Sequence, residues 1–111
     1  MSTQVHMLKC SPEYFKEVWF GNKLFECRKD DRGFKVGDTL VLQEYLHTNK
    51  QYTGAAFEAK IMYVLPGGVH GILPGYSVLS IRVNHALRVH MDKDEFNLED
   101  NKFSHLLNEH D

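Results

Sequence analysis

The sequence has no apolar run long enough to cross a membrane as a helix, and it contains only two cysteines and three prolines. A membrane helix requires roughly 20 consecutive apolar residues, so we expect no membrane-spanning segment. Residues 1–4 lack the basic and apolar regions of a secretory signal. Cys10 and Cys27 do not have the C-x-x-C spacing of a zinc site, which favours two reduced, largely buried thiols. We therefore expect a cytoplasmic protein without a cofactor or a metal site.

Neither sign of charge predominates, because 13 basic and 15 acidic side chains leave a net charge of −2. This charge is unevenly distributed, since residues 92–111 carry seven acidic and two basic side chains and residues 1–91 carry a net +3. We expect one domain over residues 1–91, followed by an acidic tail over residues 92–111 in which Phe103, Leu106 and Leu107 have helical spacing. The mild positive charge of the domain is compatible with a phosphate-bearing ligand.

The domain shows signals for one helix among several short strands. Ser11, Pro12 and Glu13 predict a helix start, with the helix covering residues 12–20. Gly54 predicts a bend or bulge in a long strand. The predicted strands cover residues 4–9, 24–29, 39–46, 51–65 and 76–83. This order predicts a mostly β (α+β) fold, a small antiparallel or mixed β-barrel with one early helix.

Three charged residues, Lys23, Glu26 and Arg28, gather where a glycine turn enters a predicted strand. Side chains alternate along a strand, so Glu26 and Arg28 share one face. Phe25 and Cys27 point to the other face, which we expect to be the core. Exposed ion pairs contribute only about 0–1 kcal/mol each, so stability alone does not require such a row of charges. The three charges predict a binding site; the alternative is a structural ion-pair cluster that closes the barrel.

Two more charged residues are candidates. Arg32 belongs with Asp30 and Asp31 to a predicted turn and is a candidate phosphate contact. Glu44 lies on a strand with apolar residues on both faces, so its carboxylate requires a partner. Arg28 or Lys9 could be that partner, and a ligand contact is equally compatible with this position.

Two aromatic residues, Tyr52 and Tyr76, adjoin turn glycines and are candidates for stacking on a base. Tyr14, Phe15 and Trp19 instead have the spacing of a helix core. The seven histidines are scattered along the chain, with no spacing that suits a metal site.

The pattern G-x-K-x-x-E-x-R, formed here by Gly21, Lys23, Glu26 and Arg28, resembles the signature of ASCH domains. Six further segments resemble a small bacterial and phage group within the superfamily of ASCH domains. These segments are His6–Lys9, Pro12–Phe15, Asp30–Asp38, Leu42–Tyr45, Tyr52–Gly54 and Gly75–Tyr76. The resemblance covers residues 5–83. It implies a PUA-like β-barrel that binds RNA or a modified nucleotide in a cleft beside the signature helix and strand.

One branch that resembles ASCH domains consists of amidohydrolases that deacetylate acetylated cytidine, using the signature lysine, a threonine at the glutamate position and a further glutamate. This chain keeps the lysine as Lys23 but has Glu26 in place of the threonine. Glu26 would favour the charged ammonium of Lys23 and so oppose its use as a base. In an amidase of this type, the catalytic residues would be Lys23, Glu26 and Glu44.

A third possibility is a phage-type accessory domain that binds another protein through the acidic tail. The main expectation is a module that binds RNA, a nucleoside or a nucleotide. Its expected ligand-binding residues are Lys23, Glu26, Arg28, Arg32, Glu44, Tyr52 and Tyr76.

Overall fold

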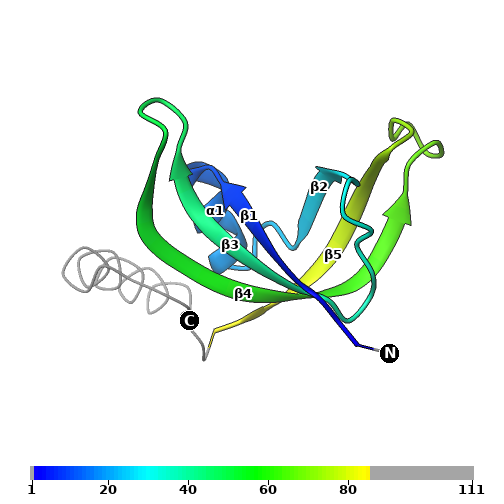
Figure 1. Cartoon of the computed structure of the whole chain (residues 1–111), viewed down its shortest axis with the longest axis horizontal. Coiled ribbons are helices and arrows are strands. Elements are labelled where there is room, and N and C mark those ends of the chain that lie inside the picture. Colours follow the sequence, from blue (N-terminus) through cyan, green and yellow to red (C-terminus); the bar gives the residue numbers. More distant parts are fainter. Residues whose placement is uncertain (1, 86–111) are drawn as a thin grey trace.

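The structure is a computed structural model that describes residues 2–85, so the predicted acidic tail and its helix lie outside the described residues. The described part contains five strands and one helix, with the helix lying in the hollow of a curved sheet (Figure 1). The elements are β1 (Val5–Cys10), α1 (Pro12–Trp19), β2 (Phe25–Lys29), β3 (Thr39–Leu46), β4 (Gln51–Pro66) and β5 (Tyr76–Asn84). The predicted mostly β fold with one early helix is confirmed, and the sheet curls into a half-barrel that is open on one side. No helix among these residues is long and apolar enough to span a bilayer.

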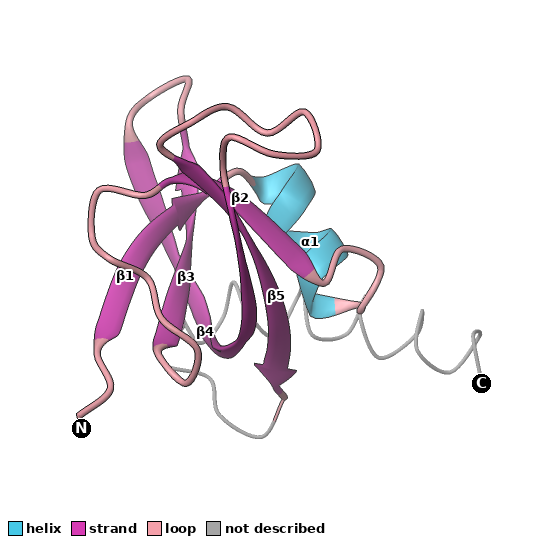
Figure 2. Ribbon diagram, turned by 90° about the vertical axis from the view of Figure 1, so that its right-hand side faces the viewer, coloured by secondary structure: helices cyan, strands magenta, loops and turns pink. Residues whose placement is uncertain are grey.

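The sheet has the strand order β1-β3-β4-β5-β2, so β1 and β2 are its two end strands (Figure 2). β1 pairs with β3 in parallel, and the other three pairs are antiparallel. The parallel pair is possible because α1 and β2 lie between β1 and β3 in the chain, which gives the long connection that parallel strands need. The open side of the half-barrel therefore lies between the first two strands of the sequence.

Helix α1 begins where Pro12 occupies the first turn, a position that suits its fixed φ and requires no N–H donor. Glu13 in the first turn and Lys16 in the last turn have the charges that the helix dipole favours at each end. The chain leaves the helix through Gly21 at φ +81°, a left-handed conformation that glycine adopts without strain. The helix ends at Trp19, one residue before its predicted end.

The core lies between α1 and the concave face of the sheet. Phe15 and Trp19 pack on Phe57 of β4, with ring centroids 4.6 and 5.3 Å away. Burying a side chain of this size contributes about 1.5–3 kcal/mol, so these contacts hold the helix against the sheet. Tyr14 is not part of this core, and its predicted core role is wrong. It is 51% exposed because it lies beyond the buried stripe of a short helix, facing the cleft described below.

Strand β4 gives the sheet its curvature. Its register with β3 shifts between Gln43 and Tyr45, next to Gly54 at φ +100°, as the predicted bulge requires. A second shift, against β5, lies between Ile61 and Tyr63. Bulges bend a strand and increase its twist, so β4 can pass along the base of the sheet and pair with a different strand at each end (Figure 1).

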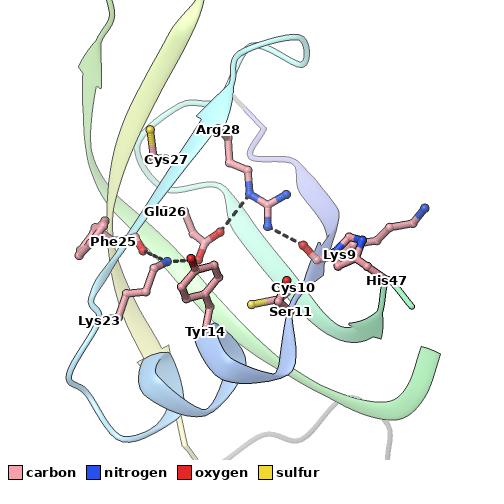
Figure 3. Close-up of a pocket in the computed structure, with 10 residues that line it drawn as sticks. All are labelled: Lys9, Cys10, Ser11, Tyr14, Lys23, Phe25, Glu26, Cys27, Arg28 and His47. Carbon is pink, nitrogen blue, oxygen red and sulfur yellow. Dashed lines mark hydrogen bonds and ion pairs between the residues drawn. The ribbon is translucent and has the colours of Figure 1, made fainter. Parts of the chain in front are cut away.

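The predicted alternation of β2 is present, but the assignment of its apolar side to the core is wrong. Phe25 is 47% exposed and Cys27 is also exposed, whereas Glu26 is only 3% exposed. Figure 3 shows Cys27 on the opposite side of the β2 ribbon from Glu26 and Arg28. The charged face points inward because β2 is an end strand whose inner face borders the open side, where the half-buried cations Lys23 and Arg28 can neutralise a carboxylate.

Candidate ligand-binding cleft

A cleft of about 640 Å³ occupies the open side of the half-barrel (Figure 3). One wall consists of the end of β1 and the start of α1, and the other consists of β2 with the preceding Lys23. His47, in the turn between β3 and β4, lies at the rim. Ligand pockets commonly measure about 300–1,000 Å³, so this cleft is large enough for a nucleotide-sized molecule.

The carboxylate of Glu26 lies at the centre of this cleft. Its Oε2 accepts a hydrogen bond from Lys23 Nζ at 2.9 Å, and its Oε1 accepts one from Arg28 Nε at 3.0 Å. The side chain of Glu26 is 4% exposed, against 19% for Lys23 and 27% for Arg28. A carboxylate this buried is tolerated only when it is paired and hydrogen-bonded. Glu26 therefore fixes the positions of two cations whose other sides reach the cleft.

Lys23 is held on several sides. Its Nζ donates to the carbonyl oxygen of Phe25 at 2.8 Å as well as to Glu26. The same atom lies 4.8 Å from the ring centroid of Phe25 and 5.3 Å from that of Tyr14, within the range of cation–π contacts. This arrangement suits a fixed positive charge beside an aromatic surface. It does not suit an amine that must lose its proton to act as a base.

Arg28 spans the open side of the half-barrel. Its Nη2 donates to the carbonyl oxygen of Lys9 in β1 at 2.6 Å, while its Nε remains on Glu26. A guanidinium has five N–H donors, so three have no protein acceptor among the described residues. Arg32 makes a second bridge, donating from Nη1 to the carbonyl oxygen of Met7 at 2.8 Å. Arg28 thus combines a structural bridge with donors that remain free for an anion.

Two side chains between the end of β1 and the start of α1 complete the inner wall. Cys10 is buried, and burial first, then the nearby Glu26 carboxylate, raises the pKa of its thiol to about 12. The thiol is protonated at neutral pH and is therefore a poor nucleophile. Ser11 is the N-cap residue of α1 but its hydroxyl does not cap the helix, so it is free to contact a ligand. Residues 2–85 contain no cluster of side chains suited to a metal ion.

The structure brings Lys23, Glu26 and Arg28 together but places the other predicted site residues outside the cleft walls. Glu44 lies at the β3–β4 bulge, where it accepts a hydrogen bond from Thr53 Oγ1 at 2.8 Å. Tyr52 contacts the ring of Tyr45, with centroids 4.9 Å apart. Tyr76 begins β5 and does not line the cleft. The loop of residues 67–75 before it does not line the cleft either.

Seven other wall residues were not predicted as ligand contacts, namely Lys9, Cys10, Ser11, Tyr14, Phe25, Cys27 and His47. They come from three separate segments, and no local pattern marks them. Their common feature is topological, because the pairing order makes β1 and β2 the two end strands that border the cleft.

Comparison with known proteins identifies the family. Residues 5–81 match the family described as "Domain of unknown function (DUF3850)". A relative from Escherichia phage P2, described as "Uncharacterized 12.9 kDa protein in GpA 3'region", is 39% identical over 61 residues, which is 55% of this chain and 54% of the relative. The chain thus spans about half the length of this curated relative. The matched residues 5–81 include every residue that lines the cleft. The chain belongs to the DUF3850 family.

Proposed function

We propose that this domain binds RNA or a modified nucleotide in the cleft between β1 and β2. The observation that carries the proposal is the cluster of Lys23 and Arg28 around the buried carboxylate of Glu26, with the exposed ring of Tyr14 beside it. The excess of positive charge suits a phosphate, and the exposed ring suits a base. The resemblance of the G-x-K-x-x-E-x-R segment to ASCH domains of PUA-like fold supports the same class of ligand.

The contacts assign each residue a distinct role. Three N–H donors of Arg28 have no acceptor within residues 2–85, and Arg28 would bind a phosphate through its planar fork. Tyr14 is 51% exposed and would stack on a base. The hydroxyl of Ser11 would contact the ribose or a base edge. Glu26 would position the two cations, because both of its oxygens already accept hydrogen bonds.

The same contacts favour binding over catalysis. A deacetylase of the acetylated-cytidine type would need Lys23 as a base, but its ammonium donates to Glu26 and to the Phe25 carbonyl. Burial raises the pKa of the Cys10 thiol to about 12, so this thiol holds little thiolate for nucleophilic attack at neutral pH. Glu44, the further glutamate considered for that reaction, lies outside the cleft walls.

The test is fluorescence anisotropy with a labelled single-stranded RNA of about ten nucleotides, measured between about 50 and 200 mM salt. We expect binding that weakens as salt increases. Arg28→Ala should weaken it about tenfold or more, since a hydrogen bond to a charged group contributes about 1.5–3 kcal/mol. Tyr14→Ala should also weaken RNA binding. Because the Tyr14 side chain is 51% exposed, this substitution should leave the fold intact. The control Arg82→Ala removes an exposed arginine from β5, outside the cleft.

Two outcomes would contradict the proposal. The first is a wild-type protein that binds no RNA and shows no thermal shift with nucleosides or nucleotides. The second is release of acetate from N4-acetylcytidine that disappears in Lys23→Ala, which would establish the amidohydrolase in its place.

A further inference from the structure

A second group of cationic and aromatic side chains lies at the β3–β4 hairpin, next to the cleft. Lys9 Nζ is 4.5 Å from the ring centroid of Tyr45. The Tyr45 ring in turn meets His47 and Tyr52 edge-on, with centroids 5.0 and 4.9 Å away. We call Lys9, Tyr45, His47 and Tyr52 the hairpin cluster. Lys9 alternates with buried neighbours along β1, so this cluster lies on the outer face of the sheet.

The hairpin cluster is continuous with the cleft through two of its members. The carbonyl oxygen of Lys9 accepts the hydrogen bond from Arg28 inside the cleft, while its ammonium lies on Tyr45 outside. His47 both lines the rim of the cleft and contacts Tyr45. Lys9 and His47 thus belong to both surfaces, so an extended ligand can pass from one to the other.

The charge and exposure of the hairpin cluster suit a nucleic acid. Residues 45–53 contain Lys50 and no acidic side chain. Lys9 forms no ion pair with any described residue. Tyr52 is 51% exposed and His47 is also exposed, so their rings are accessible to a base. Sites for single-stranded nucleic acid combine positive charge along the backbone with exposed aromatic rings.

We infer that the hairpin cluster is a second base-stacking subsite, so that the domain binds a single-stranded RNA of at least two nucleotides in preference to a free nucleotide. One base occupies the cleft, the linking phosphate crosses the edge of β1 near Arg28, and the next base stacks on His47 or Tyr52. This inference rests on the proposed function, because the subsite extends the same cleft.

The experiment compares two ligands, a nucleoside monophosphate and a single-stranded RNA of the same base, by isothermal titration with the full chain. The wild type should bind the RNA more tightly. Tyr52→Ala and His47→Ala should each weaken RNA binding at least about fivefold, the lower end of one stacking contact. Binding of the monophosphate should not change in Tyr52→Ala, because Tyr52 does not line the cleft. Tyr52→Phe should restore RNA affinity, because it keeps the ring.

A matched control is Tyr63→Ala, which removes a tyrosine that is 59% exposed at the other end of β4. It should leave the affinity for both ligands unchanged. Equal loss of RNA affinity in Tyr63→Ala and Tyr52→Ala would overturn the subsite, as would unchanged RNA affinity in both hairpin variants. If the wild type binds neither ligand, the proposed function fails and the subsite fails with it. If the wild type binds both ligands and neither Tyr52→Ala nor His47→Ala changes RNA affinity, the subsite is rejected and the proposed function stands.

Discussion

Arg28 of β2 donates a 2.6 Å hydrogen bond from its side chain to the backbone carbonyl of Lys9 in β1, across the open side of the half-barrel. The two strands are at opposite ends of the sheet order and share no backbone ladder. The side chain therefore performs part of the closure that strand pairing performs in a complete barrel. Arg28 can therefore both help to close the barrel and bind a ligand, because one guanidinium has donors for both contacts.

Arg28→Lys should lower the stability of the protein. A lysine keeps the charge but has no planar fork, so it cannot hold Glu26 and the Lys9 carbonyl together in the same geometry. We expect a loss of about 1.5–3 kcal/mol, the range for a hydrogen bond to a charged group, in urea unfolding at neutral pH. Arg82→Lys is the control, because Arg82 is exposed on β5. Equal unfolding midpoints for the two variants would show that the bridge contributes nothing.

Glu26→Gln should change stability and ligand binding in opposite directions. Removing the buried charge leaves Lys23 and Arg28 without their counter-ion, and breaking a buried pair commonly costs about 3–5 kcal/mol. The same change makes the cleft more positive, so RNA or a nucleotide should bind more tightly wherever the variant remains folded. Thermal unfolding and anisotropy on the same samples measure both effects. Weaker binding by folded Glu26→Gln would mean that Glu26 itself contacts the ligand.

The two cysteines should differ sharply in their reaction with a thiol reagent. Cys27 is exposed, whereas the pKa of the buried Cys10 thiol is raised from 9.0 to about 12, which reduces its thiolate about a thousandfold at a given pH. Native protein at pH near 7 should therefore react rapidly at one thiol, and the second should react only after unfolding. Labelling with a chromogenic disulfide counts both. In Cys27→Ser the fast phase should disappear, and a fast phase that persists would place a reactive thiolate at Cys10.

Asp38 should make the protein sensitive to acid. Burial raises the pKa of its carboxyl, but hydrogen bonds from His6 and from the backbone N–H groups of Gln4 and Lys35 outweigh burial and lower it. As the pH falls, the unfolded state therefore takes up a proton before the folded state does. The stabilisation is present above the unfolded pKa of about 3.9 and is lost as the pH falls towards the folded pKa.

Asp38→Asn should consequently be less stable at pH 7, by about 1–3 kcal/mol, and should lose less stability than the wild type below about pH 4. Urea unfolding measured across this pH range tests both expectations. Asp31→Asn is the matched control, because the side chain of Asp31 is 61% exposed and its contact with Arg32 is 3.6 Å long. If the free energy of unfolding changed with pH in the same way in the wild type and in Asp38→Asn, Asp38 would not be the cause of the acid sensitivity.

The order and type of the elements could be predicted from the sequence because each has a local signal. Pro12 marks the helix start, Gly54 marks the bulge, and the polar segment 47–50 marks the hairpin. The inward face of β2 could not be predicted in this way. Apolar alternation identifies the two faces of a strand, but only the position of β2 at the end of the sheet decides which face meets the interior.

The residues of the candidate site also divide into those that a local sequence pattern predicts and those that only the strand pairing brings together. Lys23, Glu26 and Arg28 belong to one short segment, so their spacing alone predicts that they meet. Lys9 and His47 join them only through the pairing of β1 with β3 and of β3 with β4. Such long-range pairings leave no mark in the local composition of either segment, and so these wall residues could not be found from the sequence.

The curvature of β4 has a consequence for which ligands the cleft admits. The cleft is the gap left between the two ends of one continuous sheet, so its width depends on how strongly that sheet bends. The bending is concentrated at the two bulges of β4, near Gly54 and near Met62, whose residues do not line the cleft. Sequence changes at these distant positions can therefore alter the size of ligand that fits while every residue of the cleft stays the same.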